Sequence, residues 1–188
     1  RVSRCRVGGA HRHGHLSVHP VTSQEPETLV ANYSFSGAAL AQVDGTEHRQ
    51  IYTTPILEEP VHLSGEPRID IRLACDRPAA NVSVWLVSLP WNARSDAKIT
   101  DNIITRGWAD PQNSQSIEAS APLEPGRFYD LSFTLQPDDQ IIPAGQQIGL
   151  MIFSSDQDFT LHPEPGTELT VDLNHTSLRL PVVGGPEA

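Results

Sequence analysis

Histidine is the chemically most suggestive residue type near the N-terminus of this chain, where His11, His13 and His15 alternate. Alternate residues of an extended segment share one face, so the three imidazoles could together bind Zn²⁺, Ni²⁺ or Cu²⁺. Structural metal sites, however, usually take paired ligands from folded elements. The surrounding segment is polar and has few large apolar side chains. We therefore treat these histidines as weak metal candidates and expect no resident metal or other cofactor.

Serine, histidine and aspartate, the residue types of a hydrolytic triad, also occur along the chain. An α/β-hydrolase places its nucleophilic serine on a sharp turn with the pattern Gly-x-Ser-x-Gly. No serine of this chain has a glycine two residues away on both sides. The sequence therefore predicts no catalytic residues in this chain by itself.

Acidic side chains gather at Asp138 and Asp139 and again at Asp156 and Asp158. Carboxylate oxygens on loops are suitable ligands for Ca²⁺. The spacing matches no EF-hand, and aspartates in turns commonly hydrogen-bond their own backbone. Turn formation is the plainer interpretation of these groups.

The tryptophans Trp85, Trp91 and Trp108 offer flat apolar rings on which a sugar could stack. A stand-alone carbohydrate-binding module is therefore one hypothesis for this chain. Tryptophans in a domain of this size more often belong to the core or to an interface, which is the interpretation we favour.

The composition limits the classes of partner. The chain has 188 residues and a formal net charge of −10, so nucleic acid and anionic membranes are poor partners. No apolar run is long enough to span a membrane, and nothing resembles a signal peptide, so a cytoplasmic or a secreted location remains open. Two cysteines make no disulfide framework, and we expect free thiols.

Period-two alternation predicts half-buried strands. In the segment 68–75, Ile69, Ile71 and Leu73 fall on one face and charged residues on the other. The segments 127–135 and 168–173 repeat this pattern.

The segments 81–89 and 148–153 are apolar on both faces, which requires cover on both sides. One side is the partner sheet. For the other side two alternatives stay open: a neighbouring domain, which would make residues such as Trp85 and Phe153 part of an interface, or a local segment of this chain.

Turn signals that contain Pro and Gly separate the predicted strands, as at Pro125-Gly126. The chain has 16 prolines and 13 glycines, which suits many short strands and argues against long helices. We predict an all-β fold, a jelly-roll-like β-sandwich over residues 28–188. Residues 1–27, rich in Arg, His, Gly and Ser, are predicted to form an irregular, poorly ordered tail.

An ordered set of segments carries a resemblance that no single motif would establish. The set comprises Asp101–Asn113 with its Arg-Gly-Trp, Leu123–Tyr129, Ile142–Asp156 and the closing Leu180–Gly185. In this order they resemble the C-terminal galactose-binding-like β-sandwich of the Xaa-Pro dipeptidyl-peptidase and cocaine-esterase family of serine hydrolases.

The resemblance implies a specific architecture. In such proteins an α/β-hydrolase domain comes first and carries the catalytic serine, aspartate and histidine, and the sandwich packs on it and helps shape the substrate entrance. No catalytic residue can therefore be transferred to this chain. Gly107, in the Arg-Gly-Trp segment, is expected to allow a close backbone approach.

The leading hypothesis is a non-catalytic C-terminal domain that supports the hydrolase domain and walls its active-site cleft, with possible homo-oligomerisation. The carbohydrate-binding module is the alternative, and a self-standing metal-dependent enzyme would need a folded histidine cluster. The candidate interface or ligand residues are Trp85, Trp91, Arg106, Trp108 and Phe153.

Overall fold

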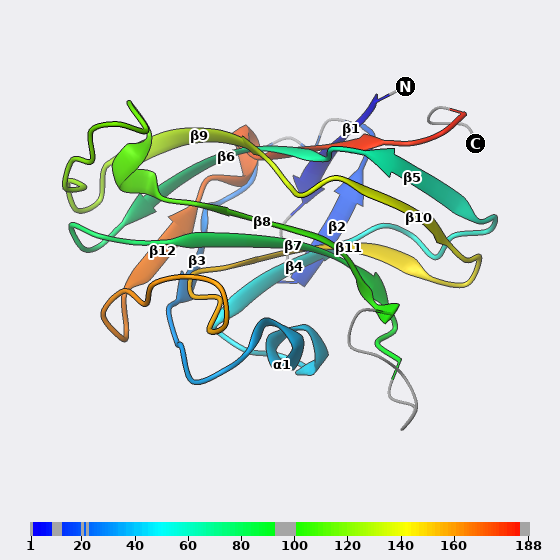
Figure 1. Cartoon of the computed structure of the whole chain (residues 1–188), viewed down its shortest axis with the longest axis horizontal. Coiled ribbons are helices and arrows are strands. Elements are labelled where there is room, and N and C mark those ends of the chain that lie inside the picture. The colour runs from blue at the N-terminus through cyan, green and yellow to red at the C-terminus, as the bar shows by residue number, and fades with distance from the viewer. Residues whose placement is uncertain (1, 9–12, 20, 22, 93–100, 185–188) are drawn as a thin grey trace.

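The computed structural model describes residues 2–8, 13–19, 21, 23–92 and 101–184 (Figure 1). A short α-helix, α1, spans Gly37–Gln42, and two 3₁₀ turns, η2 and η3, span Pro111–Asn113 and Leu173–His175. The remaining regular elements of the described part are strands. They are β1 (Val2–Gly8), β2 (His13–Ser17), β3 (Glu27–Val30), β4 (Arg49–Thr53), β5 (Val61–Gly65), β6 (Arg68–Cys75), β7 (Val82–Leu89), β8 (Ile103–Ala109), β9 (Phe128–Thr134), β10 (Asp138–Ile142), β11 (Gln147–Phe153), β12 (Glu168–Val171) and β13 (Ser177–Pro181).

The strands form two layers around one main core. One path of hydrogen-bonded neighbours runs β3-β12-β6-β13-β1-β2-β4-β11-β7-β8, β9 pairs with β6, and β5 and β10 form a separate ribbon. The path bends back on itself, so that residues of β6 and β9 meet residues of β7 and β11 in one apolar cluster. In Figure 1, β9 and β6 lie above β8 and β7, and α1 lies below them. The predicted all-β sandwich is confirmed.

The N-terminal segment is part of the sheet. β1 pairs antiparallel with β13 and with β2, and β2 pairs with β4 in parallel. Val7 and Leu16 are buried in the main core. The prediction of an irregular tail over residues 1–27 is therefore wrong for β1 and β2, whereas the described residues between β2 and β3 form no helix or strand. These strands satisfy their backbone groups through neighbours on both sides and contribute few apolar side chains, so their sequence pattern is weak.

β6 has the predicted alternation. Ile69, Ile71 and Leu73 are almost fully buried in the main core, and the intervening charged side chains lie outside. β7 and β11 are buried along both faces, also as predicted. Val84 and Ile152 face the main core, whereas the alternate positions of the same strands form a second cluster.

Helix α1 covers the second cluster, which contains Trp85, Met151 and Phe153 together with Leu40 and Ala41 of the helix. The Ser36 hydroxyl caps the helix by accepting a hydrogen bond from the backbone N–H of Ala39 at 3.2 Å. A Cβ at Gly37, the first residue of α1, would lie 2.4 Å from the Trp85 ring, so only glycine fits there. The cover over Trp85 and Phe153 is therefore supplied locally, by this chain.

Gly107 of β8 permits a second close approach, as expected from the sequence. A Cβ on this residue would lie 2.5 Å from Cδ2 of Leu135 and 3.1 Å from its Cα. β8 can therefore pack directly on the chain that follows β9. Within the described part of the chain, no helix is long and apolar enough to cross a membrane.

Candidate functional site

The carboxylate of Asp156 organises the loop that follows β11. Its side chain is fully buried, and Oδ2 accepts hydrogen bonds from the indole Nε1 of Trp85 at 2.9 Å and of Trp108 at 3.0 Å. Thr160 closes the following turn by bonding the backbone of Asp156. A buried carboxylate that accepts two N–H donors fixes both rings. Of the pair Asp156 and Asp158 noted in the sequence, Asp156 is thus a structural hydrogen-bond acceptor.

Phe159 and Arg106 complete a stack on these rings. Phe159 stacks on Trp108 with a centroid separation of 5.4 Å. The guanidinium carbon of Arg106 lies 4.4 Å from the Phe159 centroid and 5.5 Å from the Trp85 ring. Cation–π contacts of this kind hold an arginine in place without a carboxylate. We call Arg106, Trp85, Trp108, Phe159 and Asp156 the Asp156 cluster.

Exposed apolar side chains continue this surface. Tyr33 is 39% exposed, Phe35 42%, Phe159 51% and Leu161 87%. We call these four residues the aromatic rim. Tyr33 stacks on His162 at 5.0 Å, so the segment between β3 and α1 contacts the segment between β11 and β12. Figure 1 shows both segments beside α1, on the lower side of the sandwich. Exposed large apolar side chains on neighbouring loops make this side of the domain a candidate interaction site.

The structure brings Trp85, Arg106 and Trp108 together in the Asp156 cluster, and Phe153 contacts the Trp85 ring edge to face. Trp85 and Phe153 are buried, and Arg106 and Trp108 are half-buried beside the aromatic rim. Trp91 lines a different pocket, to which neither of the other tryptophans contributes. The three tryptophans therefore do not form one exposed platform.

Sequence reasoning missed Tyr33, Phe35 and Phe159 as surface candidates. These aromatic residues stand in turn segments, outside the alternating strands. A large aromatic residue where no strand pattern can bury it is the signal that could have revealed them.

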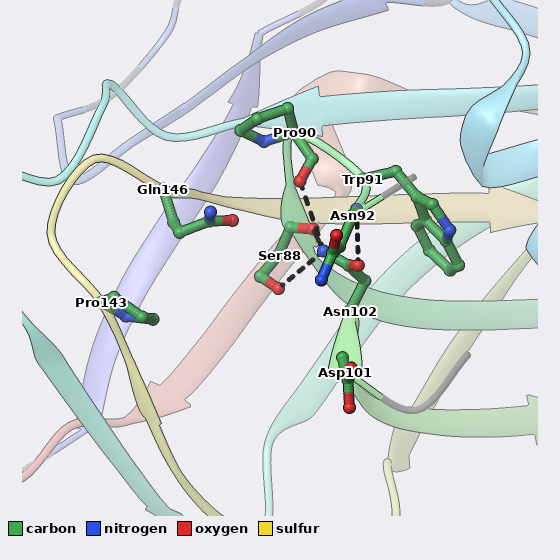
Figure 2. A pocket seen from close by; sticks show the side chains of 8 residues that line it. All are labelled: Ser88, Pro90, Trp91, Asn92, Asp101, Asn102, Pro143 and Gln146. Atoms are coloured by element: carbon green, nitrogen blue, oxygen red, sulfur yellow. Dashed lines mark hydrogen bonds between the residues drawn. The ribbon is translucent and has the colours of Figure 1, made fainter. Parts of the chain in front are cut away.

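A pocket of about 360 Å³ lies at the C-terminal end of β7 (Figure 2). Trp91, Ser88 and Asn102 line it together with Gln146. Asn102 donates to the carbonyl of Ser88 at 2.7 Å and accepts from the backbone N–H of Asn92 at 2.7 Å. Its amide thus links the end of β7 and the residues after it to the residue before β8.

The histidine prediction meets the structure only in part. His13 and His15 lie on β2, and His15 is exposed, while His11 lies outside the described residues. In the part of the chain that the structure covers, no group of three or more potential ligand side chains could hold a metal ion.

Cys75 and Tyr52 are buried titratable groups. Burial raises the pKa of the Cys75 thiol, and this free cysteine is therefore a poor nucleophile at neutral pH. Burial and the hydrogen bond to Glu27 also raise the pKa of the Tyr52 phenol. Both groups are structural in character.

The outer face of β6, β9 and β13 carries mainly charged side chains, together with the Phe128 ring beneath Arg72. Asp70 binds Arg179 at 2.8 Å and accepts a hydrogen bond from Ser132, which in turn accepts from Arg68. Arg72 lies 3.6 Å from carboxylate oxygens of both Asp130 and Asp172. We call this surface the ion-pair face. Its charged groups pair mainly with one another and are partly exposed to water, so each pair contributes little to stability.

Comparison with known proteins gives this arrangement a family. Residues 4–187 match the family described as X-Pro dipeptidyl-peptidase C-terminal non-catalytic domain. The chain belongs to this family. A candidate Xaa-Pro dipeptidyl-peptidase of Rhodopirellula baltica is 68% identical over 179 residues, which cover 95% of this chain and 29% of that protein. A candidate enzyme of the same name from Bacillus cereus is 41% identical over 131 residues, covering 70% of this chain and 21% of its own length.

This chain therefore spans less than a third of the length of either relative. Solved structures share its fold. An α-amino acid ester hydrolase superposes with a TM-score of 0.74 at 17% identity, over 96% of this chain and 36% of that one. A CocE/NonD family hydrolase of Staphylococcus aureus superposes with a TM-score of 0.66 at 10% identity, over 98% and 36%.

Proposed function

We propose that this domain supports the α/β-hydrolase domain of an Xaa-Pro dipeptidyl-peptidase and forms one wall of its active-site cleft. The family's description as C-terminal and non-catalytic supports chemistry elsewhere in a longer polypeptide. The names of the Rhodopirellula and Bacillus relatives support hydrolysis of Xaa-Pro peptides as the activity of that polypeptide.

The aromatic rim is the observation that carries this proposal. Its four side chains are substantially exposed, and one of them, Phe159, is held by the Asp156 cluster through its stack on Trp108. Exposed aromatic rings on a rigid support are the kind of side chains that provide most of the affinity at protein interfaces. A domain held on the same polypeptide meets such a surface at high effective concentration.

The second part of the proposal, the wall of the cleft, follows from the stiffness of this surface. Gly37 sits directly on the buried Trp85 ring, so the start of α1 cannot shift without disturbing the second cluster. A wall that orients substrate needs this fixed geometry.

A chimera tests the proposal. This chain replaces the matched 179-residue segment of the Rhodopirellula baltica relative, and a second protein ends before that segment. We expect the chimera to hydrolyse Gly-Pro-p-nitroanilide and the shortened protein to lose most of kcat/KM. The isolated chain should show no turnover.

Two results would contradict the proposal. The first is a shortened protein with the same kcat/KM and the same unfolding temperature as the chimera. The second is hydrolysis by the isolated chain that disappears when one of its own serines is replaced. Light scattering on the chimera reports separately whether the domain also mediates homo-oligomerisation.

A further inference from the structure

Arg106 differs in what surrounds its charge from the other arginines whose side chains the structure describes. The other described arginine side chains each reach an oxygen of this chain. Arg49 donates to the carbonyl of Leu40 at 2.8 Å, and Arg127 pairs with Glu124 at 2.6 Å. Arginines with such acceptors are Arg49, Arg68, Arg72, Arg77, Arg127 and Arg179.

Arg106 has aromatic neighbours instead. It faces Trp85 across the β7–β8 pair, and its guanidinium lies against the rings of Trp85 and Phe159. No hydrogen-bond acceptor or carboxylate for this guanidinium occurs in the described part of the chain. Acidic groups outnumber basic ones, 23 to 13, so an arginine without a carboxylate is conspicuous here.

The nearby buried acid does not take this role. Oδ2 of Asp156 accepts from the two indole N–H groups, and Oδ1 has no hydrogen-bond partner among the described residues. Asp156 therefore fixes the rings, and the rings fix the guanidinium. The planar donors of Arg106 are held in few orientations, which lowers the entropic cost of binding an anion.

The position of Arg106 relates it to the aromatic rim. Phe159 belongs both to the rim and to the stack on Arg106. A partner that covers the rim would also remove water from the guanidinium. A desolvated arginine without an acceptor would oppose such an interface, whereas one that meets a carboxylate through paired hydrogen bonds would stabilise it.

We propose that Arg106 anchors the docked domain by binding a carboxylate side chain of the catalytic domain of the same polypeptide. The inference rests on the proposed function and names the group that the partner must present. The catalytic domain is the favoured occupant because the matched segment is only 29% of the Rhodopirellula relative, whose remaining residues are linked to it covalently.

The test uses the full-length chimera with Arg106→Met, which keeps the length of the side chain and removes its charge. Arg68→Met on the ion-pair face is the matched control. Docking is measured as the rate of protease cleavage between the domains and as the temperature at which they unfold together. We expect Arg106→Met to raise the cleavage rate about tenfold or more, and Arg68→Met to leave it unchanged.

Two further variants separate recognition from simple packing. Arg106→Lys retains the charge but not the planar fork, so it should recover only part of the docking. Arg106→Glu should disrupt docking most strongly. A single Asp→Arg or Glu→Arg change in the catalytic domain should then restore it, and that residue is the partner carboxylate. A merely structural Arg106 would show no such rescue.

Several outcomes would overturn the inference. Equal behaviour of Arg106→Met and Arg68→Met would do so, as would failure of every carboxylate reversal to rescue Arg106→Glu. An effect of Arg106→Met that varies with protein concentration would assign the carboxylate to a second copy of the chain. If docking persists while sodium acetate protects Arg106 from a guanidine-modifying reagent, the ligand is a free carboxylate. Loss of activity on removing the domain, with no effect of Arg106→Met, would refute this inference and leave the proposed function intact.

Discussion

The outer face of β6 and β9 and the outer face of β7 and β11 carry side chains of opposite character, although both belong to one sandwich. Arg68, Asp70 and Arg72 point outward from β6 and form the ion-pair face. Trp85 and Phe153 occupy the equivalent outward positions of β7 and β11 and are buried beneath α1. The same alternation of residues therefore ends in water on one side and in a second core on the other.

This difference indicates which face of the domain contributes more to its stability. Burial of large apolar side chains contributes far more than exposed ion pairs. The α1 side is consequently expected to be rigid and sensitive to substitution, and the ion-pair face tolerant. The aromatic rim and Arg106 stand on the rigid side.

Replacement of Trp85, on the α1 side, should have the largest effect on the free energy of unfolding. Trp85→Ala removes a buried ring and one of the two donors to Asp156, and should lower the free energy of unfolding by about 3–5 kcal/mol. Urea unfolding followed by far-UV circular dichroism measures this. Trp85→Phe, which keeps most of the volume but loses the N–H donor, should cost about 1–3 kcal/mol. Equal stability of Trp85→Ala and the wild type would show that the second cluster is not a core.

Gly37→Ala tests the packing between α1 and Trp85 on the same side of the sandwich. Alanine favours a helix over glycine by about 1 kcal/mol, but its Cβ would lie 2.4 Å from the Trp85 ring. We expect a net loss of about 1–3 kcal/mol in the free energy of unfolding. In a Trp85→Ala background the clash is absent, so the same change should become neutral or stabilising. Additive effects in this double-mutant cycle would contradict the close contact.

Removal of Asp70 should have a much smaller effect. Asp70→Ala deletes the carboxylate that Arg179 and Ser132 bind, yet these groups are partly exposed and water can replace it. We expect a loss of about 0–1 kcal/mol, decreasing further as salt is added. Urea titrations at low and high ionic strength measure both effects. A loss as large as that of Trp85→Ala would abolish the distinction between the two faces.

Asp139 gives the smallest effect, and the pH dependence of that effect lies in the acid range. Hydrogen bonds from His62 and Ser64 hold the pKa of the Asp139 carboxyl below its usual value. Unfolding returns that pKa to about 3.9, so the contribution of Asp139 is present above about pH 4. It is lost as the pH falls through the folded-state pKa. Asp139→Asn should therefore differ slightly from the wild type at neutral pH, and the difference should shrink below about pH 4.

Strands with a clear alternation were predictable, and elements with few apolar residues were not. Ile69, Ile71 and Leu73 identified β6 because a half-buried strand has a period of two. β1 and β2 escaped prediction because only Val7 and Leu16 of their described side chains reach the core. Their place depends on backbone pairing with distant strands, which leaves no local signature.

The candidate site was predictable in its ingredients but not in its assembly. Trp85, Arg106 and Trp108 were singled out from the sequence. Their joint arrangement depends on Asp156, 71 residues beyond Trp85, and on the loop that places Phe159. Contacts over such separations are set by tertiary packing, which no short window of sequence encodes.

The central place of the N-terminal strands has a consequence for where this domain can be cut. β1 and β2 lie between β13 and β4 in the strand order. A protein begun at residue 28, the boundary that the sequence pattern favours, would lose the middle of its sheet rather than one end. β13 and β4 would then present unpaired edges, and open strand edges template aggregation. Removal of β1 and β2 would therefore expose two strand edges in the interior of the sheet and make the shortened domain prone to aggregation.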